Sequence, residues 1–233
     1  MQKIAVFDGD GLMALHQHQY SEPSRIDELI EQFRPDKGVL SSVIGKDKKM
    51  IKALKAKLSS FLWFDKNTKI PISIEYETIS TLGNDRIAAV VGANLLHPAK
   101  NLLVIDAGTA ITFELLEASG VYKGGNISLG LTTRFRALNF FTDNLPLVKE
   151  LKVVPLIGTT TESAIQAGVI NGMVYEIDGV IDALKAKYDE IYVFLTGGHA
   201  TYFADRLKNR TFVDRNLVLT GLNRILEYNA KTM

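Results

Sequence analysis

Two segments of the chain share one pattern: an apolar strand, a short turn that contains Asp and Gly, and a second apolar strand. The first is KIAVFDGDGLMALHQ at residues 3–17, and the second is LLVIDAGTAITFELL at residues 102–116. Asp-Gly between two apolar runs, as in the first segment, is a strong short-range signal for a β-hairpin. Each hairpin is followed by helices and further strands, so the sequence predicts an α/β arrangement that is repeated once. We expect two similar domains that face a cleft, and a single doubly wound sheet is the alternative.

The spacing of apolar residues predicts the other elements. Helices are expected at 24–33, 46–58, 84–96 and 160–188, and strands at 38–44, 70–76, 121–127 and 190–196. The segment HPAK at residues 97–100 is the expected boundary, which gives domains 1–97 and 98–233, with a helical tail at the end of the second. In the long helix, Gly168 and Gly172 indicate a smooth face against which another backbone packs.

Composition excludes several classes of function. Lys and Arg total 27 against 26 acidic residues, so no global positive charge would draw the chain to nucleic acid or a membrane surface. The chain has no cysteine, no apolar run long enough to span a bilayer and no pattern of a secretory signal. We therefore expect a cytoplasmic protein that acts on a small molecule, without a nucleic-acid or membrane partner.

The second hairpin carries the residue types of a phosphate-binding loop. Gly108, Thr109 and Thr112 would offer backbone N–H groups and hydroxyls to a phosphate, while the carboxylate of Asp106 holds a cation. An ordinary turn between two strands is the alternative.

A second glycine-rich segment supports the binding of a nucleotide. In TGGHA at residues 196–200, the paired Gly197 and Gly198 at the end of a strand let a nucleotide lie against the backbone. The two segments together resemble the phosphate and adenosine loops of the actin-like superfamily of kinases and ATPases. The sequence therefore predicts ATP binding.

Five ordered segments resemble those of one family, the type III pantothenate kinases. They are YETISTLGNDRIAAVVGA, DAGTAITFELL with GGNISLG, GTTTESAIQAGVINGM, LTGGHA and NLVLTGLNRILEYN. The resemblance implies two actin-like (ribonuclease H-like) domains with mixed sheets flanked by helices. It also implies ATP-dependent phosphorylation of pantothenate to 4′-phosphopantothenate, the first step of coenzyme A biosynthesis. The alternative function is a non-catalytic accessory protein of transcription on the same fold.

The resemblance assigns roles on the pantothenate side. It makes Asp85 the general base for the pantothenate hydroxyl and Arg86 the partner of the substrate carboxylate, with Tyr76, Gly83 and Asn84 completing the pocket. Read without the resemblance, Asp85 is a helix N-cap, Arg86 a solvated helix charge and Tyr76 a half-buried strand residue.

One further pantothenate residue is implied to cross between subunits. Thr161 resembles the threonine that reaches pantothenate from the neighbouring subunit, which implies a homodimer with shared sites. Its alternative role is helix capping, because Thr159 and Glu162 have the spacing of a capping box.

The resemblance also implies how ATP is held. A monovalent cation, K⁺ or NH₄⁺, would bind Asp106, and Mg²⁺ would bind the phosphates. The residues implied for ATP are Lys3, Gly108, Thr109, Thr112, Gly197 and Gly198. The four histidines show no metal-ligand spacing, and His199 stands where the family usually has Asp after its Thr-Gly-Gly.

The beginning of the chain departs from the family pattern. The family opens with a strand that ends in Asp-x-Gly-Asn-Thr, and aligning Lys3 with the family's lysine leaves that strand and loop without a counterpart. From this register we expect an unfilled strand position beside residues 3–7. We also expect weak or absent activity of the 233-residue chain.

Overall fold

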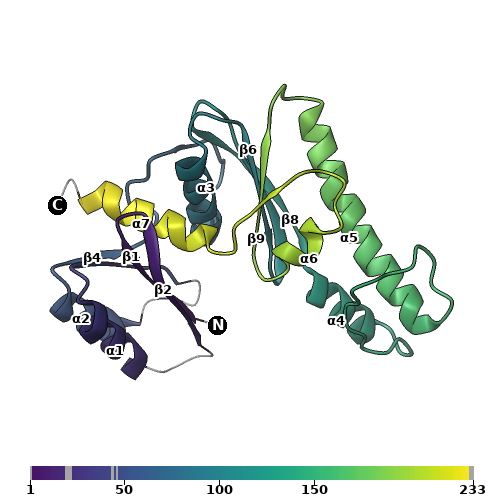
Figure 1. The fold of residues 1–233 in the computed structure, drawn as a ribbon, viewed down its shortest axis with the longest axis horizontal. Coiled ribbons are helices and arrows are strands. Elements are labelled where there is room, and N and C mark those ends of the chain that lie inside the picture. The colour runs from purple at the N-terminus through teal and green to yellow at the C-terminus, as the bar shows by residue number, and fades with distance from the viewer. Residues whose placement is uncertain (1, 19–22, 43–44, 46, 231–233) are drawn as a thin grey trace. The chain divides into compact units, whose positions relative to one another are not determined.

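The computed structural model describes residues 2–18, 23–42, 45 and 47–230 (Figure 1). These residues form two compact α/β units. One consists of Met1–Leu96 and Leu217–Met233, and the other of His97–Asn216. The first unit is therefore built from two stretches that are far apart in the sequence.

The first unit begins with the predicted hairpin. Strands β1 (Gln2–Asp8) and β2 (Gly11–His18) pair antiparallel around a turn at Gly9, whose φ of +56° suits glycine. The elements that follow are α1 (Pro23–Phe33), β3 (Lys37–Leu40), α2 (Lys48–Lys57), β4 (Ser60–Trp63), β5 (Ser73–Ile74), the 3₁₀ helix Ile79–Thr81 and α3 (Asn84–Leu96). Asp47 caps α2 by accepting hydrogen bonds from the backbone N–H groups of Lys49 and Met50.

The strands at the start of the first unit form two small sheets. β1 pairs with β2, and β3 pairs in parallel with β4, each as a separate two-stranded sheet. Within the described ranges, β1 has no strand on its other edge, which is where the sequence predicts an unfilled position. Two-stranded sheets are marginal alone, so the stability of this unit depends on its helices.

Two helices provide most of the core of the first unit. Helix α3 is buried from Arg86 to Ala93, and α7 (Leu217–Ala230) packs against it. The contact is close, because a Cβ on Gly221 would collide with the carbonyl of Ala88. Asn223 adds a hydrogen bond from its Nδ2 to the carbonyl oxygen of Gly9, at 2.8 Å. The helical tail, predicted to belong to the second domain, thus lies in the first unit.

This close contact makes Gly221 sensitive to substitution. We expect Gly221→Val to lower the free energy of unfolding by roughly 1–3 kcal/mol, because the larger side chain overpacks the α3–α7 contact. Thermal melting of the two proteins measures the effect. Gly179→Ala on α5 is the control, since an added Cβ there meets no atom within 4 Å, and its melting temperature should not fall. A Gly221→Val variant as stable as the control would contradict the packing described.

The second unit is a mixed sheet covered by a long helix. Its strands are β6 (Leu102–Ala107), β7 (Ala110–Leu116), β8 (Val121–Leu129), β9 (Tyr192–Thr196) and β10 (Phe212–Val213), and they follow the order β10-β9-β6-β7-β8. Neighbours β6, β7 and β8 run antiparallel, whereas β6, β9 and β10 run parallel. Its helices are α4 (Leu131–Phe141), α5 (Thr161–Lys185) and α6 (Ala200–Ala204).

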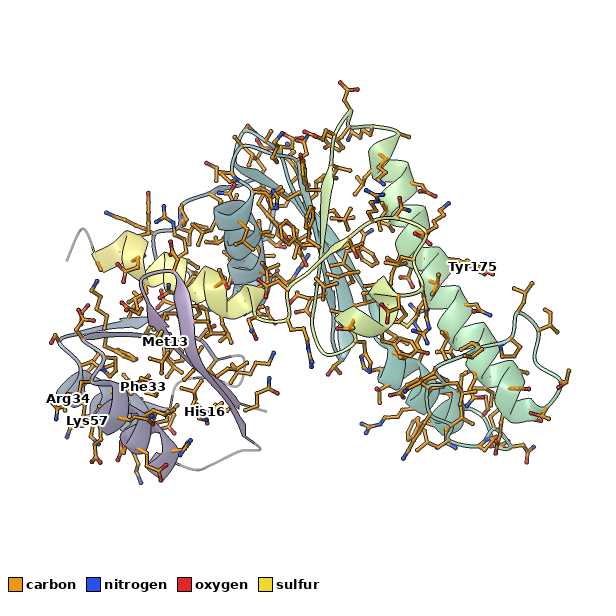
Figure 2. All side chains as sticks on the ribbon, in the orientation of Figure 1. Met13, His16, Phe33, Arg34, Lys57 and Tyr175 are labelled. Atoms are coloured by element: carbon orange, nitrogen blue, oxygen red, sulfur yellow. The ribbon has the colours of Figure 1, made fainter. Side chains whose placement is uncertain are left out.

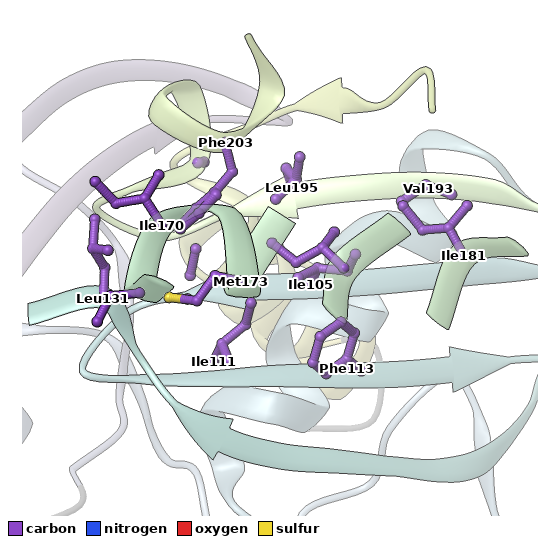
Figure 3. Packing of buried hydrophobic residues seen from close by; sticks show 14 of the residues in the cluster. Ile105, Ile111, Phe113, Leu131, Ile170, Met173, Ile181, Val193, Leu195 and Phe203 are labelled. Carbon is purple, nitrogen blue, oxygen red and sulfur yellow. The ribbon is translucent and has the colours of Figure 1, made fainter. Parts of the chain in front are cut away.

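The core of the second unit lies between this sheet and α5. Figure 3 shows Ile105 and Phe113 of the sheet beside Met173 and Ile181 of the helix, all at most 2% exposed. The apolar spacing that predicts the long helix therefore also identifies its buried face. No helix in the part of the chain that the structure describes has the length and apolar character needed to cross a membrane.

Several predicted elements are corrected. Helix α4 and strand β4 were not predicted, and the strand expected at 70–76 is reduced to Ser73–Ile74. The capping box of α5 is formed by Thr160 and Ser163 rather than by Thr159 and Glu162. Among the residues that the structure describes, no backbone packs on Gly168 or Gly172, since an added Cβ at either position meets no atom within 4 Å.

Candidate active site

The predicted base, Asp85, lies in the first turn of α3. Its carboxylate is exposed, and Oδ1 accepts a hydrogen bond from the backbone N–H of Arg86 at 2.9 Å. The helix begins with a hydrogen bond from the Ile87 N–H to the Gly83 carbonyl, so Asp85 lies just inside the helix and is not its N-cap. A carboxylate in this position is stabilised by the helix dipole. A Cβ on Gly83 would collide with Asp85 Oδ1, so glycine is needed to leave the carboxylate in place.

Arg86 is buried, whereas Asp85 is exposed. Only 9% of Arg86 is exposed, and its guanidinium carbon lies 5.9 Å from the centre of the Tyr76 ring. This distance is that of a cation–π contact. The structure thus brings Tyr76 and Arg86 together, and the alternative of a solvated helix charge is wrong.

Asn84 connects the start of α3 to the residue that follows β4. Its Nδ2 donates to the carbonyl oxygen of Phe64 at 2.9 Å. Its Oδ1 is buried and has no hydrogen-bond partner within the described part of the chain. A buried acceptor without a donor is costly, and a bound ligand with an N–H or O–H group would satisfy it.

Sequence reasoning missed a lysine that is bonded to the segment just before Asp85. Lys66 donates from Nζ to the carbonyl oxygen of Leu82. Partial burial lowers the pKa of the Lys66 ammonium, while the negative charge of Asp85 acts in the opposite direction. No sequence signal marks this lysine, because its position depends on how the loop after β4 folds back.

In the second unit, the structure brings together the two segments that predict nucleotide binding. Asp106 at the end of β6 is paired with Thr112 on β7 and with Thr196 on β9. Immediately after Thr196, Gly197 adopts φ +91°, and a Cβ there would collide with Asp106 Oδ1 and the carbonyl of Ala107. Glycine at 197 is therefore required both by its φ and by its contact with Asp106.

The turn of this hairpin is held by its own hydrogen bonds. The N–H of Gly108 donates to the Ala110 carbonyl at 3.0 Å, so Gly108 shapes the turn and its N–H is occupied within it. The carbonyl of Thr109 accepts from the N–H of Gly130 at 3.0 Å and from the hydroxyl of Thr133 at 2.7 Å. Thr109 itself is exposed, and space is open beside Gly198. These two residues leave room for a ligand.

The donor set around Asp106 is compatible with a monovalent cation. Asp106 Oδ1 and the carbonyl of Ala107 both lie close to Gly197, and the described residues contain no group of three or more His, Cys, Asp or Glu side chains placed to hold a metal. Divalent ions held by protein alone usually take several carboxylates, whereas Mg²⁺ on a nucleotide keeps water and phosphate ligands. A monovalent ion at Asp106 and Mg²⁺ on the phosphates are consistent with these residues.

The remaining predicted residues lie on exposed positions. Lys3 is exposed on β1, opposite Gln17. Thr161 is the exposed first residue of α5, next to the cap residue Thr160. His199 was given no role from the sequence. Its ring Nδ1 is buried and has no partner among the residues described. Its backbone N–H donates to the Ala107 carbonyl at 3.0 Å.

Comparison with known proteins gives the family. The family model described as type III pantothenate kinase matches residues 2–183. The chain belongs to the type III pantothenate kinase family. It is 43% identical to the type III pantothenate kinase of Phocaeicola vulgatus over 229 residues, which cover 98% of this chain and 95% of the relative. The corresponding protein of Bacteroides fragilis is 44% identical, over 97% of this chain and 93% of its own length.

A solved structure shares the fold. A Baf family transcriptional activator from Campylobacter jejuni superposes with a TM-score of 0.61 at 23% identity, over 88% of this chain and 89% of the other. The predicted family and the α/β actin-like fold are thus confirmed. The expected loss of a strand and loop receives no support from these matches, since the family model begins at residue 2 and the chain spans 93–95% of these two relatives.

Proposed function

We propose that this chain phosphorylates pantothenate with ATP. The observation that carries the proposal is the arrangement at the start of α3. There an exposed Asp85 carboxylate is kept in place by Gly83, next to a buried Arg86 that contacts Tyr76. Membership of the type III pantothenate kinase family identifies the acceptor. The product, 4′-phosphopantothenate, is an intermediate on the way to coenzyme A.

The acceptor residues divide the work of binding and proton transfer. Asp85 accepts the proton of the pantothenate primary hydroxyl as its oxygen attacks the γ-phosphorus, because a neutral alcohol is a poor nucleophile. Arg86 binds the substrate carboxylate, for which a guanidinium is suited. The unpaired Oδ1 of Asn84 offers an acceptor to a substrate N–H or O–H group, and Tyr76 and Gly83 complete the pocket.

The donor residues are those of the hairpin and the glycine segment in the second unit, together with Lys3 of the first. The hydroxyls of Thr109 and Thr112 and the bare backbone at Gly197 and Gly198 receive the nucleotide. A monovalent cation at Asp106 and Mg²⁺ on the phosphates supply positive charge to the triphosphate. Transfer requires the acceptor and donor residues to meet in the reacting complex.

Product analysis tests this function directly. Purified protein with ATP, Mg²⁺ and K⁺ should release ADP only when pantothenate is added, and mass spectrometry should detect 4′-phosphopantothenate. The second candidate, a non-catalytic accessory protein, is favoured only by the fold shared with the Baf family activator. A chain that neither binds pantothenate nor releases ADP would support that candidate.

We further propose that the protein acts as a homodimer through the second unit. Phe140 and Phe141 of α4 are each 80% exposed, and Tyr175, which projects from α5 in Figure 2, is 61% exposed. Gly168 and Gly172 leave α5 smooth in the neighbourhood of Tyr175. Exposed apolar side chains in this number are typical of a surface that is covered by a partner. A second copy is the proposed partner, and Thr161 of that copy would reach the pantothenate site.

Solution mass checks the dimer. At micromolar concentration the protein should have twice the mass of one chain, and the double substitution Phe140→Ser with Phe141→Ser should shift it toward the monomer. Loss of Thr161 from the neighbour should lower the activity of that monomer. The control is Met13→Ser, because Met13 is 61% exposed in the first unit and should leave the mass unchanged. A wild-type monomer would refute the proposal.

A further inference from the structure

The loop after β4 has a fixed conformation. The side chain of Asp65 accepts from the N–H of Asn67 at 3.0 Å, and the Asp65 carbonyl accepts from the N–H of Thr68 at 3.1 Å. The Thr68 hydroxyl in turn accepts from the N–H of Asp65 at 3.0 Å. Such side-chain turns hold the backbone without help from a sheet or helix. They place Lys66 at the tip of an ordered turn.

Two hydrogen bonds join this loop to the start of α3, one to Asn84 in the first turn of the helix and one to Leu82 just before it. Asn84 Nδ2 donates to the Phe64 carbonyl, and Lys66 Nζ donates to the Leu82 carbonyl. The side chains of Phe64 and Leu82 are both 1% exposed, so each bond ends on a residue anchored in the core. The position of Lys66 relative to Asp85 is therefore set by buried residues.

The ammonium of Lys66 retains hydrogen-bonding capacity for a ligand. An ammonium has three N–H donors, and the Leu82 carbonyl accepts one of them. Both Lys66 and Asp85 are exposed, so a substrate can reach them. Leu82 precedes Asp85 by only three residues, so the hydrogen bond to the Leu82 carbonyl brings this ammonium to the start of α3, and the charge of Asp85 acts on it.

We propose that Lys66 binds the transferred phosphoryl group on the acceptor side of the site. The inference rests on the proposed function, in which Asp85 takes the proton of the acceptor hydroxyl. The oxygen of that hydroxyl forms the new bond to phosphorus as the bond between phosphorus and the ADP oxygen breaks. The phosphoryl oxygens therefore come within a few ångströms of Asp85 during transfer, next to the Lys66 ammonium.

The other anionic group of the acceptor is assigned elsewhere. The carboxylate of pantothenate is at the opposite end of the molecule from its primary hydroxyl, and Arg86 is the residue proposed to bind it. Arg86 lies against the Tyr76 ring, whereas Lys66 is bonded to the carbonyl of Leu82, three residues before Asp85. Positive charge placed where phosphoryl transfer occurs stabilises the transition state and the phosphorylated product.

Steady-state kinetics provide the first test. We expect Lys66→Met to lower kcat about 100-fold, as loss of one charge-stabilising group in other enzymes does, with a change of KM for pantothenate of less than about 3-fold. Lys66→Arg should recover part of kcat because it restores the positive charge. Lys69→Met is the matched control, since Lys69 is an exposed lysine on the same loop, and it should behave as the wild type.

Ligand binding provides a second test that does not require turnover. In calorimetric titrations, Lys66→Met should weaken binding of 4′-phosphopantothenate about 10-fold or more and leave binding of pantothenate nearly unchanged. Equal weakening of both ligands would show that Lys66 only supports the loop, which overturns the proposal. The proposal also fails if Lys66→Met binds both ligands as Lys69→Met does. A wild-type chain that binds neither ligand overturns the proposed function itself.

Discussion

Asp85→Asn should reduce pantothenate-dependent ADP release by roughly 10³-fold, within the range usual for loss of a general base. The amide cannot accept the hydroxyl proton, yet it has nearly the same shape and still accepts the hydrogen bond from the Arg86 N–H. The melting temperature should therefore change little, and pantothenate should still bind. Initial rates at saturating ATP and pantothenate, together with thermal melting, measure both effects.

Asp10→Asn is the control for this substitution. Asp10 is an exposed carboxylate in the turn between β1 and β2, and the proposed function gives it no part in phosphate binding. It should retain wild-type activity. If Asp10→Asn loses activity and Asp85→Asn retains it, the first hairpin is the phosphate loop and the assignment of the base is wrong.

Gly197→Ala should weaken ATP binding by about 100-fold or more. At φ +91° an alanine is strained, and its Cβ would collide with the carboxylate of Asp106 and the carbonyl of Ala107. The substitution must therefore move Asp106 or the end of β9, and both belong to the proposed nucleotide site. Titration with a non-hydrolysable ATP analogue measures the loss.

Gly120→Ala is the control, because it introduces similar backbone strain at a position outside the proposed nucleotide site. Gly120 has φ +82° in the turn between β7 and β8, and an added Cβ meets no atom within 4 Å. Its substitution should cost about 1–2 kcal/mol of stability and leave ATP affinity unchanged. If both glycine variants bind ATP as the wild type does, the contact between Gly197 and Asp106 has no part in holding the nucleotide.

The sequence is informative where one short pattern determines the local structure. Asp-Gly between apolar runs predicts the first hairpin, and Asp-Ala-Gly-Thr between apolar runs predicts the second. The repeat of Ile165, Val169 and Met173 predicts the buried face of α5. The glycine after Thr196 could be assigned to a nucleotide site because parallel strands β6 and β9 end at the same edge of the sheet. In these cases the residues that matter lie within one element or at its end.

Elements that depend on distant partners were harder to predict. The N-cap residue of helix α4 is Gly130, which makes no side-chain cap, and the helix has only two buried residues, so its start and its apolar face give weak signals. Strand β4 has only four residues, too few for a clear alternation of apolar and polar positions, and it is defined by its pairing with β3. Lys66 is one of many lysines until a folded loop brings it near Asp85.

The helix α7 has a consequence for how the protein is made. Residues from Leu217 onward leave the ribosome after all of His97–Asn216, yet α3 needs them to cover its apolar surface. Domains usually fold in the order of synthesis. Here we expect the second unit to fold first on the nascent chain, while α3 remains uncovered and open to chaperones until α7 emerges to pack against it.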